Sequence, residues 1–222
     1  NNKTTIKYKK LYHPSIENPV TNDINFNKNK IITGPNAAGK TTILKATILS
    51  TIFSQQFGFG YFKSGTLSPF EHFHCYINIP DTSGRDSLFQ AEARRCKEIL
   101  DKIMASAPNE KHFCIFDELY SGTNPYEAIG SAVSFLKYLN NYSNVSFIIT
   151  THFIDLCNRL DNNKKIINCN MKVNTNDEKF EYKYKIIKGI SKIKGGVKVL
   201  TDLDYPQDII INTKKIIDEL II

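Results

Sequence analysis

A glycine-rich segment has the residue types and spacing of a phosphate-binding loop. Residues 34–41 fit G-x-x-x-x-G-K-[ST] in full, between an apolar run at 30–33 and a helix-like stretch at 40–57. Such a loop binds phosphate because its backbone N–H groups turn inward around the anion, next to a helix N-terminus. We expect Lys40 to reach the β- and γ-phosphates of ATP and Thr41 to ligate Mg²⁺. The predicted nucleotide-binding residues are Gly34, Pro35, Asn36, Ala37, Ala38, Gly39, Lys40, Thr41 and Thr42.

Two adjacent carboxylates follow a second apolar run. Residues 113–116 are typical of a buried strand, and Asp117 and Glu118 come directly after them. Ligands of open α/β sheets bind at the carboxyl ends of the strands, so we expect both carboxylates near the phosphates. Asp117 is then placed to hold Mg²⁺, and Glu118 to polarise the attacking water as a general base. A solvated strand end is the alternative, but a phosphate-binding loop needs a partner of this kind.

A histidine and a serine extend the predicted site. His152 lies just past the apolar run 145–150, where it could contact the γ-phosphate or the attacking water; a capping or core histidine is the alternative. Ser87 opens the helical pattern 88–104 as its N-cap, and the same helix end could also bind an anion. The predicted catalytic residues are Glu118, His152 and Lys40, and the predicted metal ligands are Thr41 and Asp117.

Composition narrows the class of protein. The chain has 222 residues, of which 41% are hydrophobic and 23% charged, as in an ordinary globular protein without a membrane partner. The five cysteines are odd in number and never form C-x-x-C, which favours reduced thiols packed in the core of an intracellular protein. Cytoplasm, nucleus and organelle are not distinguished. Because the chain opens with Asn1 and not Met, we interpret it as a piece of a longer protein.

Two further patterns have competing interpretations. The net charge of +7 suits a nucleic-acid partner, but a lysine-rich composition explains it almost equally well. His72 and His74 alternate along a predicted strand and so share a face, which suggests a metal site. Without further ligands nearby, we interpret them as structural or surface histidines.

Strand-like and helix-like segments alternate along most of the chain. This alternation predicts an α/β fold with a mostly parallel sheet flanked by helices. In the tail, glycines at 195–196 and Pro206 separate two short helical patterns, the second at 207–220. We therefore divide the chain into a main domain, 1–188, and a helical segment, 189–222. Expected strands are 30–33, 73–79, 113–116, 145–150, 166–173 and 182–187; expected helices are 40–57, 88–104, 125–139 and 153–160.

With these motifs in order, the chain resembles the MutS family of mismatch-repair ATPases, within the ATP-binding-cassette class of P-loop proteins. Residues 32–42 (ITGPNAAGKTT) are close to the family's ITGPN-x-x-GKST, and 87–92 match its S-x-F-x-x-E signature. Further matching pieces are His13-Pro14, Asn22-Asp23, Gln56-Phe57-Gly58, Asp117-Glu118, Gly122-Thr123-Asn124 and Thr151-His152. Three departures mark a divergent member: Thr42 for a serine, Ser121 for an arginine, and Gly84-Arg85-Asp86 before the signature.

The resemblance implies an arrangement that the residues alone do not. Two ATPase domains pair head to tail with ATP sandwiched between them, so that Ser87 acts in trans on the partner's nucleotide. The tail forms a helix-turn-helix that braces this homodimer, and DNA is contacted by domains outside this segment. Mismatch recognition lies upstream in the family.

We predict a Mg²⁺-dependent ATPase domain of a MutS-like DNA mismatch repair or recombination protein. The alternatives are a nucleotide-gated dimerisation module with little hydrolysis and a P-loop small-molecule kinase. The signature at 87–92 and the helical tail are evidence against the kinase, which also lacks an evident substrate lid. Intact Asp117, Glu118 and His152 are evidence against a module without hydrolysis.

Overall fold

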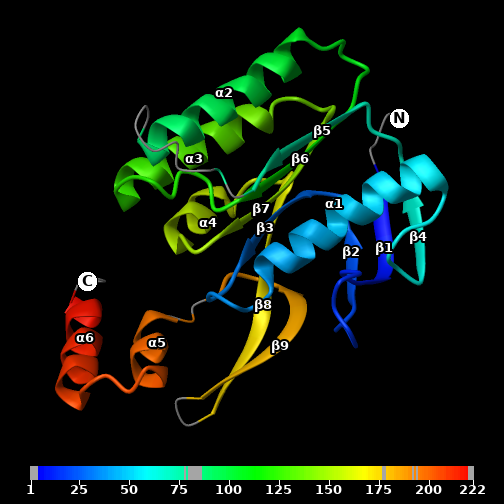
Figure 1. Cartoon of the computed structure of the whole chain (residues 1–222). Coiled ribbons are helices and arrows are strands. Elements are labelled where there is room, and N and C mark those ends of the chain that lie inside the picture. The colour runs from blue at the N-terminus through cyan, green and yellow to red at the C-terminus, as the bar shows by residue number, and fades with distance from the viewer. Residues whose placement is uncertain are drawn as a thin grey trace.

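A six-stranded sheet forms the centre of the computed structural model, which describes residues 5–77, 79, 87–176, 179–191, 193 and 195–219 (Figure 1). The strand order is β5-β6-β7-β3-β8-β9, and neighbours run parallel except β8 and β9, which are antiparallel. The predicted mostly parallel sheet is confirmed. Its strands are β3 (Asn29–Thr33), β5 (His72–Tyr76), β6 (His112–Asp117), β7 (Val145–Thr151), β8 (Ile166–Asn176) and β9 (Lys179–Lys188).

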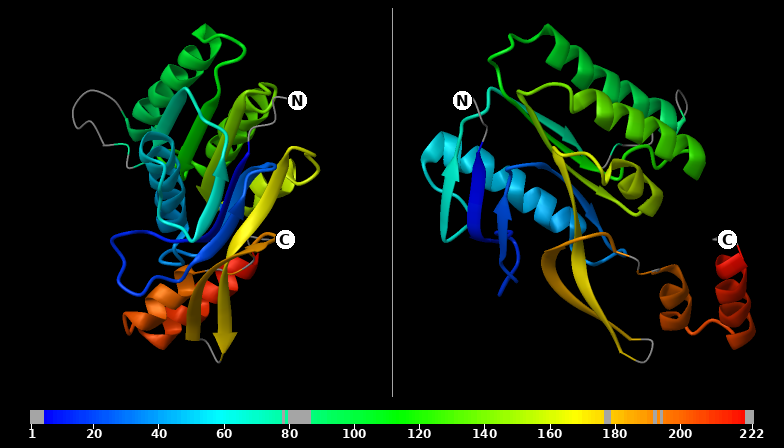
Figure 2. Two further views of the ribbon diagram at one scale, coloured as in Figure 1. Left: turned by 90° about the vertical axis from the view of Figure 1, so that its right-hand side faces the viewer. Right: turned by 180° about the vertical axis from the view of Figure 1, so that it is seen from behind.

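Helices cover both faces of this sheet, so its central strands are apolar on both sides. On β6, Phe113 and Ile115 belong to the core beneath α1, whereas Cys114 and Phe116 belong to the core beneath α2, α3 and α4 (Figure 2). This period of two is the strand geometry expected of a buried parallel strand. The helices are α1 (Lys40–Phe57), α2 (Leu88–Ala105), α3 (Pro125–Leu139) and α4 (Ile154–Leu160).

A second, three-stranded antiparallel sheet has two strands before the loop at 34–41 and one strand after α1, and the sequence prediction did not include it. Its order is β2-β1-β4, and it shares a core with α1, where the Tyr8 hydroxyl donates a hydrogen bond to Thr51 Oγ1 at 3.1 Å. These strands are short and largely polar, so they give little periodic signal. They are β1 (Ile6–Leu11), β2 (Asn22–Asn25) and β4 (Ser64–Leu67).

The sequence prediction also needs correction at one strand and one cysteine. The strand expected at 73–79 ends at Tyr76. Cys75 is exposed, whereas the other four cysteines are buried as predicted. Both differences occur on β5, which is one of the two edge strands of the sheet and pairs, within the part of the chain that the structure describes, with β6 alone.

The C-terminal part holds two short helices, α5 (Gly196–Asp202) and α6 (Gln207–Glu219), set apart from α2 and α3 (Figures 1 and 2). No residue of α5 is buried, and Ile210 alone is buried in α6. The connection to the sheet is local. Ser191 N donates to Thr33 Oγ1 at 2.8 Å, and a Cβ on Gly195 would lie 3.0 Å from Pro35 Cβ. Among the described residues, no helix has the length and apolarity to cross a membrane.

Candidate functional site

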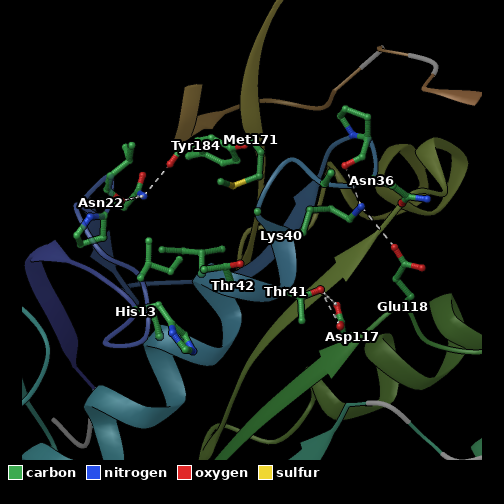
Figure 3. Close-up of a pocket in the computed structure, with 18 of the residues that line it drawn as sticks. His13, Asn22, Asn36, Lys40, Thr41, Thr42, Asp117, Glu118, Met171 and Tyr184 are labelled. Atoms are coloured by element: carbon green, nitrogen blue, oxygen red, sulfur yellow. Dashed lines mark hydrogen bonds and ion pairs between the residues drawn. The ribbon is translucent and has the colours of Figure 1, made fainter. Parts of the chain in front are cut away.

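A cavity of about 840 Å³ opens where β3 and β6 end and α1 begins (Figure 3). One end is polar and holds residues of the loop at 34–42 with Asp117 and Glu118. The other end is apolar and aromatic and is built from the loop before β2 and from strands β8 and β9. Most of the residues predicted from the loop at 34–42 and from the end of β6 therefore line one space. Gly34 and His152 line a second cavity, and Ala38 and Ser87 line neither.

The loop between β3 and α1 has the backbone of an anion-binding turn. Gly34, Ala37 and Gly39 have φ angles of 154°, 62° and 90°, and Gly39 N-caps α1 without a side-chain hydrogen bond. The first N–H groups of α1 are thus not capped by a side chain, and they carry the positive end of the helix dipole. Ala37 adopts a left-handed conformation that a non-glycine residue rarely takes, which indicates a loop shaped by its surroundings.

Lys40 is buried at 5% exposure, and its cation is held by oxygens of the loop and of β6. Nζ donates to Gly34 O at 2.9 Å and to Pro35 O at 3.3 Å, and it lies 3.4 Å from Glu118 Oε1. A buried ammonium needs such partners, and phosphate oxygens can replace them without the charge entering water.

Glu118 lies between two basic groups just past the end of β6. Its Oε2 is 3.6 Å from His152 Nδ1, and its Oε1 faces Lys40. The hydrogen bond from His152, together with the Lys40 charge, holds the pKa of the Glu118 carboxyl below its usual value. The carboxylate is therefore ionised at neutral pH and can accept a proton.

Asp117, the last residue of β6, receives two hydroxyl groups. Thr41 Oγ1 donates to Asp117 Oδ2 at 2.9 Å and is 3.2 Å from Oδ1, and Thr150 Oγ1 also donates to Oδ1. Carboxylate and hydroxyl oxygens are ligands that Mg²⁺ accepts, and this ion usually takes one or two carboxylates together with substrate phosphates. The described residues contain no group of three or more histidine, cysteine or acidic side chains suited to a metal. The pair Thr41 and Asp117 fits the smaller ligand set.

His152 lies in a second cavity of about 390 Å³, which residues 33–36 at the end of β3 and in the following loop also line. Glu118 and Asn36 line both cavities, so they mark where the two spaces meet. His152 has a half-exposed side chain and also contacts the Phe153 ring at 4.2 Å between centroids. The two cavities together place His152 and Lys40 on opposite sides of the Glu118 carboxylate.

Ser87 is not brought into either cavity. It N-caps α2 in a capping box, in which its Oγ accepts from Gln90 N at 3.3 Å and its N–H donates to Gln90 Oε1 at 2.8 Å. The capping interpretation is thus confirmed, and Ser87 is exposed. The preceding residues Gly84-Arg85-Asp86 lie outside the part of the chain that the structure describes.

The apolar end of the cavity includes residues to which sequence reasoning gave no role. Asn22 Nδ2 donates to Tyr184 O at 2.9 Å and Ile186 N donates to Asn22 Oδ1 at 2.8 Å, which ties the start of β2 to β9. His13, Met171 and Tyr184 line the space beside this tie (Figure 3). His13 and Asn22 were noted as motif residues, but nothing local in the sequence places Tyr184 next to them.

The histidines considered as metal ligands have other partners. His72 Nε2 is 2.8 Å from Glu110 Oε2, and His74 Nε2 is 3.0 Å from His112 Nδ1. The His72 and His112 rings stack at 4.6 Å between centroids. This cluster lies at the amino ends of β5 and β6, at the sheet edge opposite the cavity.

Comparison with known families agrees with this geometry. Residues 30–221 match the family described as MutS domain V. The chain belongs to the MutS family. The match covers both the loop at 34–41 and the C-terminal helices of this MutS-family chain.

Its curated relatives are similar at modest identity, which marks a divergent member of the MutS family. It is 29% identical to the DNA mismatch repair protein MutS of Ehrlichia ruminantium (strain Gardel), over 96% of this chain and 27% of the relative. It is 27% identical to that of Clostridium tetani, over 92% and 23%, and 28% identical to that of Bacteroides fragilis, over 86% and 22%. The chain thus spans about a quarter of the length of these relatives.

Proposed function

We propose that this chain binds ATP with Mg²⁺ and hydrolyses it, as the ATPase domain of a MutS-like DNA mismatch repair or recombination protein. One observation carries the proposal. Lys40, Thr41, Asp117 and Glu118 come from two segments 77 residues apart (117 − 40 = 77) and meet at one end of a single cavity, beside the N-terminus of α1. If Lys40 and Glu118 formed an ion pair with a structural role only, the hydrogen-bonded pair Thr41 and Asp117 would not be needed beside it.

The polar end supports binding of the phosphates. Backbone N–H groups of the loop and α1 face the anion, and Lys40 exchanges its carbonyl contacts for the β- and γ-phosphate oxygens. Thr41 and Asp117 would hold Mg²⁺, which neutralises developing charge on the phosphates when bound.

The reacting water is placed by Glu118 and His152. Glu118 accepts the proton as the water oxygen bonds to the γ-phosphorus and the bond to the β,γ-bridging oxygen breaks, giving ADP and phosphate. His152 is on the side of Glu118 away from Lys40, where it can orient the water. The lowered pKa of Glu118 keeps this base ionised.

The apolar end of the cavity supports binding of the base and ribose. Tyr184 and His13 supply rings, and Met171 a polarizable side chain, beside the Asn22 tie. Aromatic faces stack on nucleobases, and such a subsite needs no charged group.

Lys40→Ala tests the nucleotide assignment. Removing the cation that faces the phosphates lowers ATP turnover by about 10²–10³-fold, the usual loss for one electrostatic group at a reacting phosphate. Steady-state phosphate release measures this, and Lys97→Ala is the matched control because Lys97 is exposed on α2 in an ion pair with Asp101. Unchanged turnover of Lys40→Ala would disprove the proposal.

The dimer is proposed from the position of Ser87 and the exposed tail. We infer that two copies pair head to tail with ATP between them, that Ser87 contacts the partner's nucleotide, and that the C-terminal helices form a helix-turn-helix that braces the pair. Mixing Lys40→Ala with Ser87→Arg tests this, because each variant alone lacks an intact site. A mixed dimer contains one intact composite site, so activity returns on mixing. Inactive mixed dimers would refute action in trans.

DNA contact is proposed for the whole protein, because its relatives are DNA mismatch repair proteins and its net charge is +7. The isolated chain is expected to bind duplex DNA weakly and without preference for a mismatch, because lysine charge supplies backbone affinity but no base reading. Titration of matched and mismatched duplexes at equal salt measures this. Tighter binding of the mismatched duplex would place the reading element in this chain.

A further inference from the structure

A buried carboxylate on α2 holds the loop that follows Asp117 and Glu118. Glu92 is 2% exposed and lies on the core-facing side of α2, in line with Cys96, Ile99 and Ile103. An apolar residue is expected at such a position, because burying an ionised carboxylate is unfavourable unless hydrogen bonds compensate for the lost water.

The backbone donors to Glu92 come from one short segment, and the Tyr76 hydroxyl on β5 also hydrogen-bonds to this carboxylate. Glu92 Oε1 accepts from Ser121 N at 3.0 Å and from Ser121 Oγ at 2.9 Å, and Oε2 accepts from Gly122 N at 3.0 Å. Both carboxylate oxygens are therefore engaged by residues that begin three positions after Glu118. Charge-assisted bonds of this kind are stronger than those between neutral groups.

The segment they hold has an unfavourable backbone. Glu118 and Tyr120 have φ angles of 54° and 58°, in the left-handed region that non-glycine residues rarely occupy. Such a conformation persists only where the surroundings hold it in place. Glu118 N donates to Thr150 O at 3.1 Å, Tyr120 N donates to the Tyr76 hydroxyl at 3.3 Å, and Glu92 holds the far end.

Packing brings the same loop against the start of α2. A Cβ on Gly122 would lie 2.6 Å from Leu88 Cγ and 2.8 Å from Phe89 N, so only glycine allows this approach. The first turns of α2 and the loop after β6 are thus joined by close packing and by the three hydrogen bonds to Glu92.

We infer that Glu92 is a positioning residue for Glu118: it fixes the strained turn after β6 and sets the direction of the Glu118 carboxylate toward the attacking water. Glu92 touches neither phosphate nor water in this role and acts through the loop. The inference rests on the proposed ATPase function, because it assigns Glu118 as the base. Through Glu92, the N-terminus of α2, which includes Ser87, is held against the loop that follows β6 in the same chain.

Glu92→Gln tests the inference with little change of volume. The amide keeps one acceptor oxygen but turns an NH₂ group toward one of the backbone donors, so the loop loses at least one hydrogen bond. We expect the hydrolysis rate of bound ATP to fall by about 10- to 100-fold, the range for a reacting group misplaced by up to about 1 Å, with the Kd for ATP within about twofold of the parent. Glu98→Gln, on the exposed side of α2, is the matched control and keeps the parental rate.

A double variant separates positioning from a general loss of stability. If Glu92 acts through Glu118, adding Glu92→Gln to Glu118→Gln in the full chain slows single-turnover hydrolysis no further. A second reduction that multiplies the first, or a parental rate in Glu92→Gln, overturns the inference. Unchanged turnover of Lys40→Ala instead overturns the proposed function itself, and the two failures are therefore distinguishable.

Discussion

The sheet body, which is the part of the chain from β1 to β9, and the tail, which is the pair of helices α5 and α6, are stabilised in opposite ways. In the body, Phe116 and Phe147 are fully buried between helices, and the candidate site is assembled from strand ends whose register is set by the sheet. In the tail, α5 buries no residue, α6 buries Ile210, and Leu203 and Ile211 are 64% and 60% exposed. Contacts within the chain determine the conformation of the sheet body. The exposed apolar residues of the tail do not pack onto the body, so such packing does not explain their presence.

This difference separates two kinds of functional residue. Those of the candidate site are placed by a core that the chain supplies itself. The tail helices have 7 and 13 residues, lengths that are marginal in water without tertiary packing. The comparison therefore predicts large effects for changes in the body and small effects on folding for changes in the tail.

The largest effect is expected at Glu118. Glu118→Gln removes the proton acceptor but keeps the volume, so hydrolysis falls by about 10²–10⁴-fold while ATP still binds with Mg²⁺. Rapid-quench measurement of bound ATP gives the rate, and equilibrium binding of a fluorescent ATP analogue gives the affinity. A parental rate would show that the base lies elsewhere. Glu118 would then no longer be an example of a functional residue positioned by the core of the sheet body.

The next largest effect is expected from truncating a side chain in the hydrophobic core. Phe147→Ala leaves a cavity at a fully buried position of β7, so the free energy of unfolding falls by about 3–5 kcal/mol. Urea unfolding followed by circular dichroism measures this. A loss below 1 kcal/mol would mean that the body is less tightly packed than its burial indicates. Tyr126→Ala, at an 89% exposed position of α3, is the control and stays near the parental stability.

The histidine cluster gives the body a pH dependence of intermediate size. Burial, helped by neighbouring histidines, lowers the pKa of His74 and of His112 to about 4. The unfolded chain takes up these protons near pH 6.5 and the folded chain does not, so stability is present above that pH and falls as the pH drops toward 4.

The expected loss between pH 7 and pH 5 is at most about 2 kcal/mol per histidine. Unfolding midpoints at the two pH values measure it, and the double variant His74→Gln with His112→Gln should lose less stability over the same interval. An equal loss in the variant would assign the pH dependence to other groups.

The smallest effect is expected in the tail, at two adjacent positions of α6. Ile211→Ser changes a residue that is 60% exposed, so the stability of the isolated chain stays within about 0.5 kcal/mol of the parent. Ile210→Ser, at the buried neighbour, should have the larger effect, confined to hydrogen-exchange protection of α5 and α6. Global destabilisation by Ile211→Ser would show that the tail packs on the body after all.

Local motifs were predictable from the sequence, and long-range contacts were not. The loop at 34–41 and the strand before Asp117 each combine a residue pattern with a short stretch of flanking structure, so their meeting at the sheet edge follows from strand polarity. The contact of Asn22 with Tyr184 spans 162 residues and has no local signal. The sequence shows Glu92 only as the last residue of the motif at 87–92, because its backbone partners at 121 and 122 become visible only when the loop is folded.

The short link between the phosphate loop and the tail has a thermodynamic consequence. Gly195 packs against Pro35, and Ser191 is hydrogen-bonded to Thr33 at the end of β3. Gly195 directly precedes α5. An anion that moves Pro35 on binding would therefore also change the preferred position of α5. Linkage between two binding events is reciprocal. If the anion changes the affinity of the two helices for a partner by some factor, that partner changes the affinity of the loop for the anion by the same factor. The close approach of the Gly195 backbone to the Pro35 ring can thus couple binding of a ligand in the loop to the contacts that the two helices make.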